Sequence, residues 1–493
     1  MGVGAIGVNE GFTISEVLAG TGGRLMLGEK KDSVTGVSID SRTLEPGELF
    51  VAIRGERFDG HQFFYEALKE GAGGAIVAVS THRMPDNPEE EAALRGKALI
   101  GVHDTTEALQ NLARFHRRRW GGPIIGITGS NGKTTTKEML AGILSRRFSV
   151  LASKGNLNNH IGVPLTLFGL KEAHDLGVLE MGISGPGELD LLGRITEPES
   201  GIITNIGPAH LKGLITVSEV AHAKSELLTS LKGGVAVLNK DDAYYKYLAS
   251  RSPVPVIAFG RNPDSDLRLV IDREKETGLE IELVIKRSAF DDQKPPAWFR
   301  DPHSIRVSLP VIGEHQAMNA AAAAAAALSE GCSPEDIKAG LESFRPVGMR
   351  MEVLKWSGRS VLNDAYNANP ASMEAALQAL SHFGGSGKRV AVLGDMKEMG
   401  AMEEEWHRRV GAAVAGNRIG LLIAVGELAG GIAEGALAGG MAKEKIVACR
   451  EPEEAAELLK QKTREGDAIL IKGSRGARME RVLDALGLSR EDA

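Results

Sequence analysis

The sequence predicts an α/β protein of three domains, for three reasons. Its 493 residues correspond to about three domains at roughly 150 residues each. Short apolar segments alternate with helical ones along most of the chain, which is typical of sheets covered by helices. Glycine- and proline-containing junctions divide the chain into a small mixed α/β domain (residues 1–119), a central parallel-sheet domain (120–345) and a second α/β unit (346–493).

The first block mixes short strands with helices, and Val37–Arg42 and Gly47–His61 are its most distinctive segments. Near its end, the basic cluster His116–Arg119 precedes Gly121, Gly122 and Pro123. Glycine and proline interrupt regular structure, so this junction predicts a hinge, with the basic cluster as a solvated helix end.

The central block predicts a parallel sheet from four short apolar segments. They are 123–125, 177–180, 201–205 and 235–239. Residues 265–310 are more charged and alternate in polarity, which predicts an antiparallel insertion. The run Ala320–Ala327 predicts a helix with a small-residue packing face.

The last block repeats the alternation of strands and helices. Its strand-like segments are 361–364, 389–393, 420–425 and 468–471. The junction Phe344–Gly348 has the composition of a linker. Two α/β units joined by a short linker predict a cleft that closes on its ligands.

Composition and charge exclude several classes of protein. The net charge of −7 argues against a nucleic-acid-binding surface. Two cysteines, Cys332 and Cys449, cannot build a disulfide framework or a zinc site, which fits a reducing cytoplasm. The sequence has no signal-peptide pattern at its start and no apolar run of membrane-spanning length. We therefore expect a cytoplasmic protein that does not insert into membranes.

Gly126–Thr136 is the most informative segment of the chain. An apolar strand, a glycine-rich turn, a Lys-Thr pair and a helix follow one another, as in a phosphate-binding loop. Glycines let backbone N–H groups surround phosphate oxygens, and a helix N-terminus favours anions. Lys133 can reach the terminal phosphates and Thr134 can bind Mg²⁺. The common pattern has glycine where Ile127 stands, so the match is a variant.

Five further positions follow predicted strands or open helices, where chemistry is expected in α/β proteins. Glu180 closes a strand, and a buried carboxylate there needs a metal or a donor. Taken alone, His210 is a structural histidine, Lys224 a surface lysine and Asp364 part of a turn. Lys472–Arg475 is an anion clamp or a solvated loop, and the residues alone leave both open.

Together these motifs resemble the Mur ligases of peptidoglycan precursor synthesis, over about residues 13–486. Motifs of the wider family are Thr128–Thr135, Glu180, Asn205–His210, Gly313–Asn319 and Asp364. More local motifs resemble the member that adds D-alanyl-D-alanine to a UDP-N-acetylmuramoyl-tripeptide. They are Gly55–His61, Gly155–Pro164, Tyr366–Pro370, Gly394–Gly400 and Lys472–Arg475.

The resemblance implies an ATP- and Mg²⁺-dependent amide-bond ligase. The UDP-linked muramoyl peptide would be phosphorylated on its carboxylate, and the amine of D-alanyl-D-alanine would then displace phosphate. The first domain would bind the UDP end of the substrate, the central domain ATP, and a Rossmann-like C-terminal domain the dipeptide and part of ATP. We expect a monomer, while the third residue of the tripeptide, lysine or diaminopimelate, stays open.

The resemblance also implies roles for individual residues. The phosphate loop would be Gly129, Ser130, Asn131, Gly132, Lys133, Thr134 and Thr135, with Asn319, Arg350 and Asp364 at adenine and ribose. Mg²⁺ would be bound by Thr134, Glu180, His210 and Lys224, the last as a carbamate; Lys133, Glu180, His210 and Lys224 would be catalytic. Substrate contacts would come from Ser41, Arg42, Asn156, Asn158, Asn159, Asn367, Asn369, Lys472, Ser474 and Arg475.

Two departures and two alternatives accompany the resemblance. Lys212 stands where relatives more often carry an acidic residue, and the first dozen residues predict a flexible, non-catalytic extension. Another amide ligase of the superfamily, either the third-residue-adding Mur ligase or a folylpolyglutamate synthase, is one alternative; Tyr366–Pro370 and Gly394–Gly400 argue against both. A P-loop ATPase or nucleotide-binding module without ligase chemistry is the other.

Overall fold

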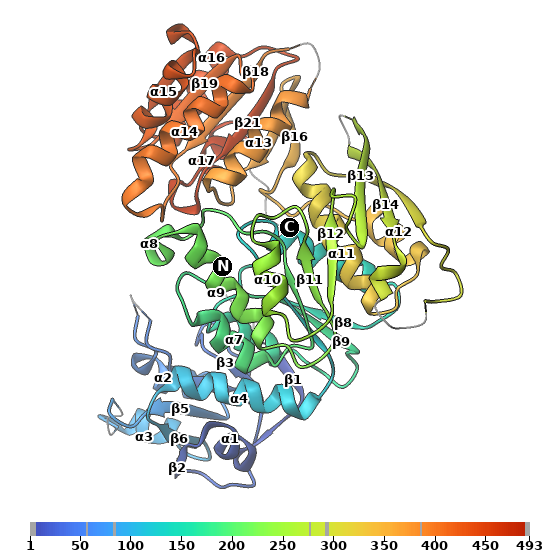
Figure 1. Ribbon diagram of the computed structural model, residues 1–493. Coiled ribbons are helices and arrows are strands. Elements are labelled where there is room, and N and C mark those ends of the chain that lie inside the picture. The colour runs from blue at the N-terminus through green and yellow to red at the C-terminus, as the bar shows by residue number, and fades with distance from the viewer. Residues whose placement is uncertain are drawn as a thin grey trace.

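The computed structural model describes residues 6–55, 58–81, 85–275, 278–290, 295–384 and 387–488. Three sheets follow one another along the chain and form three domains, with the central one between the other two (Figure 1). Glu56 and Arg57 of the Gly55–His61 motif lie outside the described residues. Within the described part, no helix has both the length and the apolar character that a membrane crossing requires.

The N-terminal sheet has the strand order β1-β3-β4-β5-β6-β2, with β1 and β2 antiparallel at its edges. Its strands are β1 (Ile6–Thr13), β2 (Arg24–Leu27), β3 (Ser33–Ser38), β4 (Leu49–Val51), β5 (Gly74–Ala78) and β6 (Ala98–Val102). Its helices are α1 (Ile14–Thr21), η1 (Gly60–Gln62), α2 (Phe64–Lys69), α3 (Pro88–Ala93) and α4 (Thr105–Trp120).

The central sheet has nine strands in the order β15-β14-β13-β12-β11-β10-β7-β9-β8. From β13 to β8 in this order, all neighbouring strands pair in parallel. These strands are β7 (Ile124–Thr128), β8 (Val150–Ala152), β9 (Leu176–Glu180), β10 (Ser200–Ile203), β11 (Ala236–Asn239), β12 (Val256–Gly260), β13 (Leu267–Lys275), β14 (Gly278–Ile285) and β15 (His303–Leu309). The antiparallel insertion is confirmed: β13, β14 and β15 pair antiparallel and extend the same sheet.

Helices cover the central sheet on both faces (Figure 1). The helices of this domain are α5 (Lys133–Leu144), α6 (Gly162–Leu167), α7 (Glu188–Thr196), α8 (Leu211–Leu214), α9 (Val217–Thr229), α10 (Tyr245–Arg251), η2 (Arg287–Phe290), α11 (Glu314–Ser329) and α12 (Pro334–Glu342). The predicted alanine helix is the middle of α11, and its alanines are buried in the core that also contains Met139 and Ile143 of α5. Small side chains let α11 pack closely on α5, the helix that follows the phosphate loop.

The C-terminal sheet has the order β16-β17-β21-β18-β19-β20, with only β16 antiparallel among the described strands. Its strands are β16 (Glu352–Trp356), β17 (Arg359–Asp364), β18 (Arg389–Gly394), β19 (Leu421–Val425), β20 (Ile446–Cys449) and β21 (Ala468–Lys472). Its helices are α13 (Pro370–His382), η3 (Gly400–Met402), α14 (Glu403–Gly416), α15 (Ala429–Ala438), η4 (Lys443–Lys445), α16 (Pro452–Lys462), η5 (Arg475–Ala477) and α17 (Glu480–Ala485).

Two predictions about the N-terminal domain are wrong. Residues 6–12 of the predicted extension are not free, because β1 pairs with β3 and Phe12 is 1% exposed. The cluster His116–Arg119 is the end of α4, as predicted, but the interpretation as a solvated end is wrong, because His116 and Arg117 are buried. Arg117 is 4% exposed and donates to the carbonyl of Thr196 at 2.6 Å and to Glu199 at 3.0 Å. The cluster therefore clamps the first domain to the second.

Glu197 is the anionic centre of this clamp and offers a pH-dependent test. Arg118 and then Arg114 donate to it and lower the pKa of Glu197 to about 2. A depressed carboxyl pKa adds stability above the unfolded-state pKa, and this contribution is lost as pH falls toward 2. We expect Glu197→Gln to lower the free energy of unfolding by about 2 kcal/mol at pH 7, with the difference shrinking below pH 4. Urea denaturation at both pH values measures it; Asp190→Asn, in an exposed pair with Arg194, is the control.

Candidate active site

The phosphate loop joins β7 to α5, as predicted, and two of its glycines have backbone angles that favour glycine. Gly129 has a φ of 148° and Gly132 a φ of 81°. A Cβ on Gly129 would overlap the hydroxyl of Thr204, and one on Gly132 would overlap the amide of Asn319. The loop is therefore packed tightly on two other segments. The ammonium of Lys133 donates to the carbonyl of Gly129 at 2.9 Å and so folds back over the loop.

The end of β10 holds the loop in shape. The backbone N–H of Ser130 donates to the carbonyl of Asn205 at 2.9 Å, and that of Asn131 donates to the Asn205 side chain at 3.0 Å. The hydroxyl of Ser130 donates to the carbonyl of Gly207 at 2.9 Å. The Asn205–His210 motif thus begins as a support for the phosphate loop.

Glu180 ends β9 beside the loop and is 3% exposed. One of its oxygens accepts from the hydroxyl of Thr134 at 2.7 Å, and the other accepts from the Asn158 amide at 2.8 Å. Among the described basic side chains, none forms an ion pair with it. A buried carboxylate with a neighbouring hydroxyl and no cationic partner is the oxygen-rich arrangement that Mg²⁺ prefers. The residues present therefore fit a magnesium ion between Thr134 and Glu180.

Lys224 lies in α9 and is 1% exposed, so the interpretation as a surface lysine is wrong. No hydrogen bond or ion pair joins its ammonium to another described residue. Burial, followed by repulsion from Lys133, lowers the pKa of Lys224 well below its usual range. Burial also lowers the pKa of Lys133, and Arg350 adds to this effect while Glu180 opposes it. Lys133, Lys224, Glu180 and Arg350 therefore share one electrostatic environment.

His210 is joined to the C-terminal domain. Its Nδ1 lies 2.7 Å from a carboxylate oxygen of Glu398, and the N–H of Lys212 donates to the Glu398 carbonyl at 3.1 Å. His210 and then Lys212 lower the pKa of Glu398. The described residues contain no cluster of three His, Cys, Asp or Glu side chains that could hold a metal. His210 is thus not grouped with Glu180 in this structure, and its metal role stays a prediction.

The C-terminal domain brings a second polar group to the phosphate loop. Lys472 donates to Asp364 at 2.6 Å and to the carbonyl of Asn367 at 2.9 Å. Asn369 caps α13 and donates from its amide to the Asn131 side chain at 2.8 Å. The turn between β17 and α13 therefore meets the loop across the domain boundary, and Lys472 at the end of β21 is bonded to that turn. Lys472 is 2% exposed, so the solvated-loop alternative does not hold for this residue.

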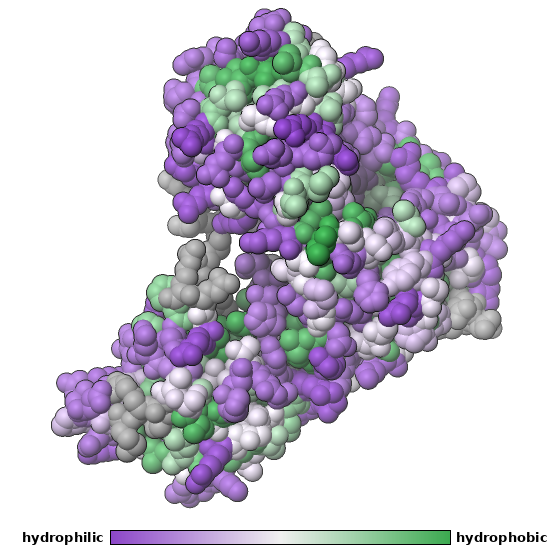
Figure 2. Space-filling view, turned by 60° about the vertical axis from the view of Figure 1, so that its left-hand side comes forward, coloured by the Kyte–Doolittle hydropathy of each residue, from purple (hydrophilic) through white to green (hydrophobic). Residues whose placement is uncertain are grey.

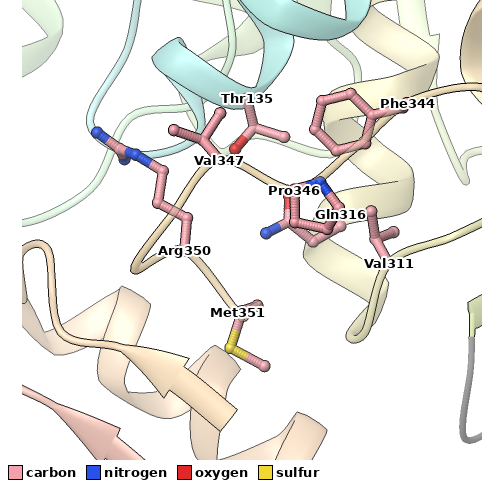
Figure 3. Close-up of a pocket in the computed structure, with 8 residues that line it drawn as sticks. All are labelled: Thr135, Val311, Gln316, Phe344, Pro346, Val347, Arg350 and Met351. Carbon is pink, nitrogen blue, oxygen red and sulfur yellow. The ribbon is translucent and has the colours of Figure 1, made fainter. Parts of the chain in front are cut away.

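A small pocket lies where α5, α11 and the linker meet (Figure 3). It is lined by Thr135, Val311, Gln316, Phe344, Pro346, Val347, Arg350 and Met351. The guanidinium of Arg350 stacks over Tyr366 at 3.9 Å from the ring centroid. Asn319 donates to Gln316 at 3.0 Å, and no hydrogen bond joins it to a described residue of the C-terminal domain. The pocket borders the phosphate loop through Thr135 and is partly apolar, but in this structure its walls are too close together to admit a purine base.

Several residues predicted to bind substrate instead have hydrogen bonds or ion pairs with nearby residues of their own domain. Asn159 accepts from the N–H groups of Ile161 and Gly162 at the start of α6. Ser474 donates to the carbonyl of Asp395, and Arg475 is paired with Glu480 at 3.4 Å. Arg42 is paired with Asp40 at 2.6 Å, and within the described part of the chain no hydrogen bond or ion pair joins Ser41 or Arg42 to another predicted site residue. Asn156 contributes its backbone carbonyl to Asn158.

Comparisons with known proteins identify this arrangement. The models of the Mur ligase middle domain, the Mur ligase glutamate ligase domain and the Mur ligase family catalytic domain match residues 127–327, 349–475 and 33–117. The UDP-N-acetylmuramoyl-tripeptide–D-alanyl-D-alanine ligase of Bacillus subtilis is 38% identical over 455 residues, which are 92% of this chain and 93% of that protein. The chain belongs to the Mur ligase family.

Solved structures agree with this assignment. MurF from Acinetobacter baumannii has a TM-score of 0.84 at 30% identity, covering 97% of this Mur ligase and 99% of that chain. MurF ligase from Thermotoga maritima, in complex with ADP, has a TM-score of 0.76 at 28% identity, covering 91% and 96%. This Mur ligase is an ATP-dependent enzyme of peptidoglycan precursor synthesis that forms a carbon–nitrogen bond.

Sequence reasoning missed four residues at the site of this Mur ligase. They are Lys137, Ser153, His315 and Glu398. Burial lowers the pKa of His315 to about 4, beside Asp364 and Lys472. His315 and Glu398 lie inside the quoted motifs Gly313–Asn319 and Gly394–Gly400, so the motifs themselves were the available signal. No sequence motif pointed to Lys137 or Ser153, because the contact between them joins two segments that are separate in the sequence.

Proposed function

We propose that this chain joins D-alanyl-D-alanine to a UDP-N-acetylmuramoyl-tripeptide, with ATP converted to ADP and phosphate. Relatives of that name align over nine-tenths of the chain at 35–38% identity, in Bacillus subtilis and Treponema pallidum. The observation that carries the proposal is the chain of contacts from Thr134 through Glu180 to Asn158, which joins the phosphate loop to the Gly155–Pro164 segment. The reaction we propose is a cytoplasmic step performed by a monomer.

The first step is phosphoryl transfer to the carboxylate of the tripeptide. A carboxylate oxygen attacks the γ-phosphorus of ATP, the bond to the β-phosphate oxygen breaks, and ADP leaves. The backbone N–H groups of Gly129–Thr135 and the ammonium of Lys133 stabilise the charge that develops on the phosphate oxygens. Lys133 must leave the carbonyl of Gly129 to do so. Asn156 and Asn158, on the segment beside Glu180, hold the carboxylate of the muramoyl peptide in line.

Thr134 and Glu180 would hold Mg²⁺, and we propose His210 and a modified Lys224 as further ligands. When bound, the ion neutralises negative charge on the phosphates. Asn319, Arg350 and Asp364 lie around the linker pocket, where we propose that adenine and ribose bind. The uridine end of the UDP-linked substrate would contact Ser41 and Arg42 in the first domain.

The second step is attack by the amine of D-alanyl-D-alanine. Its nitrogen adds to the carbonyl carbon of the acyl phosphate, and the tetrahedral intermediate expels phosphate. The proposed contacts are Asn367, Asn369, Lys472, Ser474 and Arg475, which follow β17 and β21; the bond of Asn369 to Asn131 of the phosphate loop supports this choice. The surface is hollowed between the two outer domains and is largely hydrophilic there, which suits a charged dipeptide (Figure 2).

We expect Lys224 to carry a carbamate. A buried amine without a partner, beside a second ammonium, is favoured in the neutral form, which can attack CO₂ and lose a proton to give an anion. The product replaces a repelling cation by an oxygen ligand for Mg²⁺. Protein equilibrated with ¹³C-bicarbonate should show one carbamate carbon resonance by NMR. That resonance should be absent from Lys224→Met and present in Lys232→Ala, a control at an exposed lysine.

A coupled phosphate-release assay tests the proposed function. Phosphate should appear only when ATP, UDP-muramoyl-tripeptide and D-alanyl-D-alanine are present together. Parallel assays with lysine and diaminopimelate as the third residue of the tripeptide determine the preferred substrate. Turnover with ATP alone would indicate a P-loop ATPase. Turnover with a diamino acid and the UDP-muramoyl-dipeptide would indicate the third-residue-adding ligase.

A further inference from the structure

Lys137 is a buried lysine that the proposed reaction does not use. It lies in α5, three residues after Thr134, so both side chains lie on the same face of the helix. Its side chain is 0% exposed. The ammonium donates to the backbone carbonyl of Ser153 and pairs with Glu138, whose side chain is 40% exposed, at 2.6 Å. Burying an ammonium is costly unless its hydrogen bonds compensate, so this position serves a specific contact.

Ser153 lies between the end of β8, at Ala152, and the segment 154–159. Its N–H donates to the carbonyl of Val178, and its hydroxyl accepts from the N–H of Glu180 at 3.0 Å. Within the described residues, Lys137 is the recorded donor to the Ser153 carbonyl. Ser153 therefore connects the ammonium of Lys137 with the backbone of Glu180.

The segment that follows Ser153 reaches the same carboxylate from the other side. The Asn158 amide donates to Glu180 at 2.8 Å, and the N–H of Gly182 donates to the Asn158 carbonyl at 2.8 Å. A Cβ on Gly182 would lie 2.9 Å from Cγ of Asn158, so the asparagine is packed against the backbone. Helix α5 thus holds this segment at two points, through Thr134 and Glu180 to Asn158, and through Lys137 to Ser153.

The two contacts differ in whether the proposed reaction changes them. Thr134 and Glu180 are proposed to exchange their contacts when nucleotide and Mg²⁺ bind. The contact of Lys137 with Ser153 involves no atom proposed to touch phosphate or metal, so the proposed reaction does not require it to break. We propose that Lys137 is a positioning residue that holds segment 154–159 in place for the UDP-muramoyl peptide, independently of the nucleotide.

This inference rests on the proposed function, because it assigns segment 154–159 to the UDP-linked substrate. The test compares Lys137→Met with the unsubstituted protein and with Glu138→Gln. The second variant removes the exposed partner of Lys137 and leaves its contact with Ser153. We expect Lys137→Met to raise the Kd and the KM for UDP-muramoyl-tripeptide at least tenfold, while kcat and the Kd for ADP with Mg²⁺ change less than threefold. Glu138→Gln should leave all four values within twofold, and Lys137→Arg, which keeps a cationic donor, should restore part of the loss.

Isothermal calorimetry with UDP-muramoyl-tripeptide and with ADP, together with steady-state kinetics, supplies these values. A purely structural role predicts equal losses for both ligands and a lower melting temperature, and that outcome overturns the inference. If the unsubstituted protein does not bind UDP-muramoyl-tripeptide, the proposed function fails. If it binds this ligand and Lys137→Met binds it equally well, the inference alone fails. Should Lys137→Met not fold, Lys137→Gln replaces it, with amide hydrogen exchange over 154–159 as the readout: faster exchange supports the inference and unchanged exchange overturns it.

Discussion

We expect Lys133→Ala to abolish detectable ligation while the UDP-linked substrate still binds. The ammonium of Lys133 is the positive group at the start of α5, and it folds over the loop at 2.9 Å from the Gly129 carbonyl. Removing a preorganised group that stabilises transition-state charge lowers kcat by about 100- to 1,000-fold, and we expect the upper end because Lys133 faces the transferred phosphate. The phosphate-release assay measures this loss.

Calorimetry separates catalysis from binding in this variant. The affinity for UDP-muramoyl-tripeptide should stay within threefold, because the uridine contacts are proposed in another domain. Lys232→Ala, at an exposed lysine of the same domain, should retain full activity. Loss of UDP-substrate binding in Lys133→Ala would contradict the division of ligands among the three domains.

Gly132→Ala is expected to have the second large effect, through backbone geometry. Gly132 has a φ of 81° and caps the N-terminus of α5, a conformation that alanine adopts only with strain. Its added Cβ would also overlap the Asn319 side chain. The N-terminus of α5 must then shift, so its N–H groups no longer converge on phosphate. We expect the Kd for ADP to rise at least about 100-fold, the equivalent of roughly 3 kcal/mol.

Gly142→Ala is the matched control in the same helix. An added Cβ there meets only the carbonyl oxygen of Gly340, at 3.8 Å, and the residue lies in the helical interior. Alanine is favoured over glycine in a helix by about 1 kcal/mol, so this variant should be equally active and slightly more stable. ADP binding by calorimetry and thermal denaturation distinguish the two variants. Normal ADP affinity in Gly132→Ala would show that the loop adapts, and would remove the argument from its geometry.

The local patterns predicted much of the fold. The strand, glycine turn and helix of Gly126–Thr136 is confirmed, as are the parallel strands around it and the antiparallel insertion at β13–β15. These features depend on neighbours in sequence: apolar spacing, glycine in the turn and alternation of polarity. The interpretation of His116–Arg119 as a solvated helix end was wrong for Arg117, because the burial of Arg117 depends on Glu199, 82 residues later.

By itself, the sequence determined the class of fold, the nucleotide loop and the family, because ordered local motifs carry that information. Only the tertiary structure decided which side chains meet. His210 finds Glu398 at a separation of 188 residues, and Asn131 finds Asn369 at 238. It also showed that Lys224 and Lys137 are buried. Burial and pairing depend on how the domains pack, and for a charged group they set both its cost and its chemistry, which spacing along a chain does not reveal.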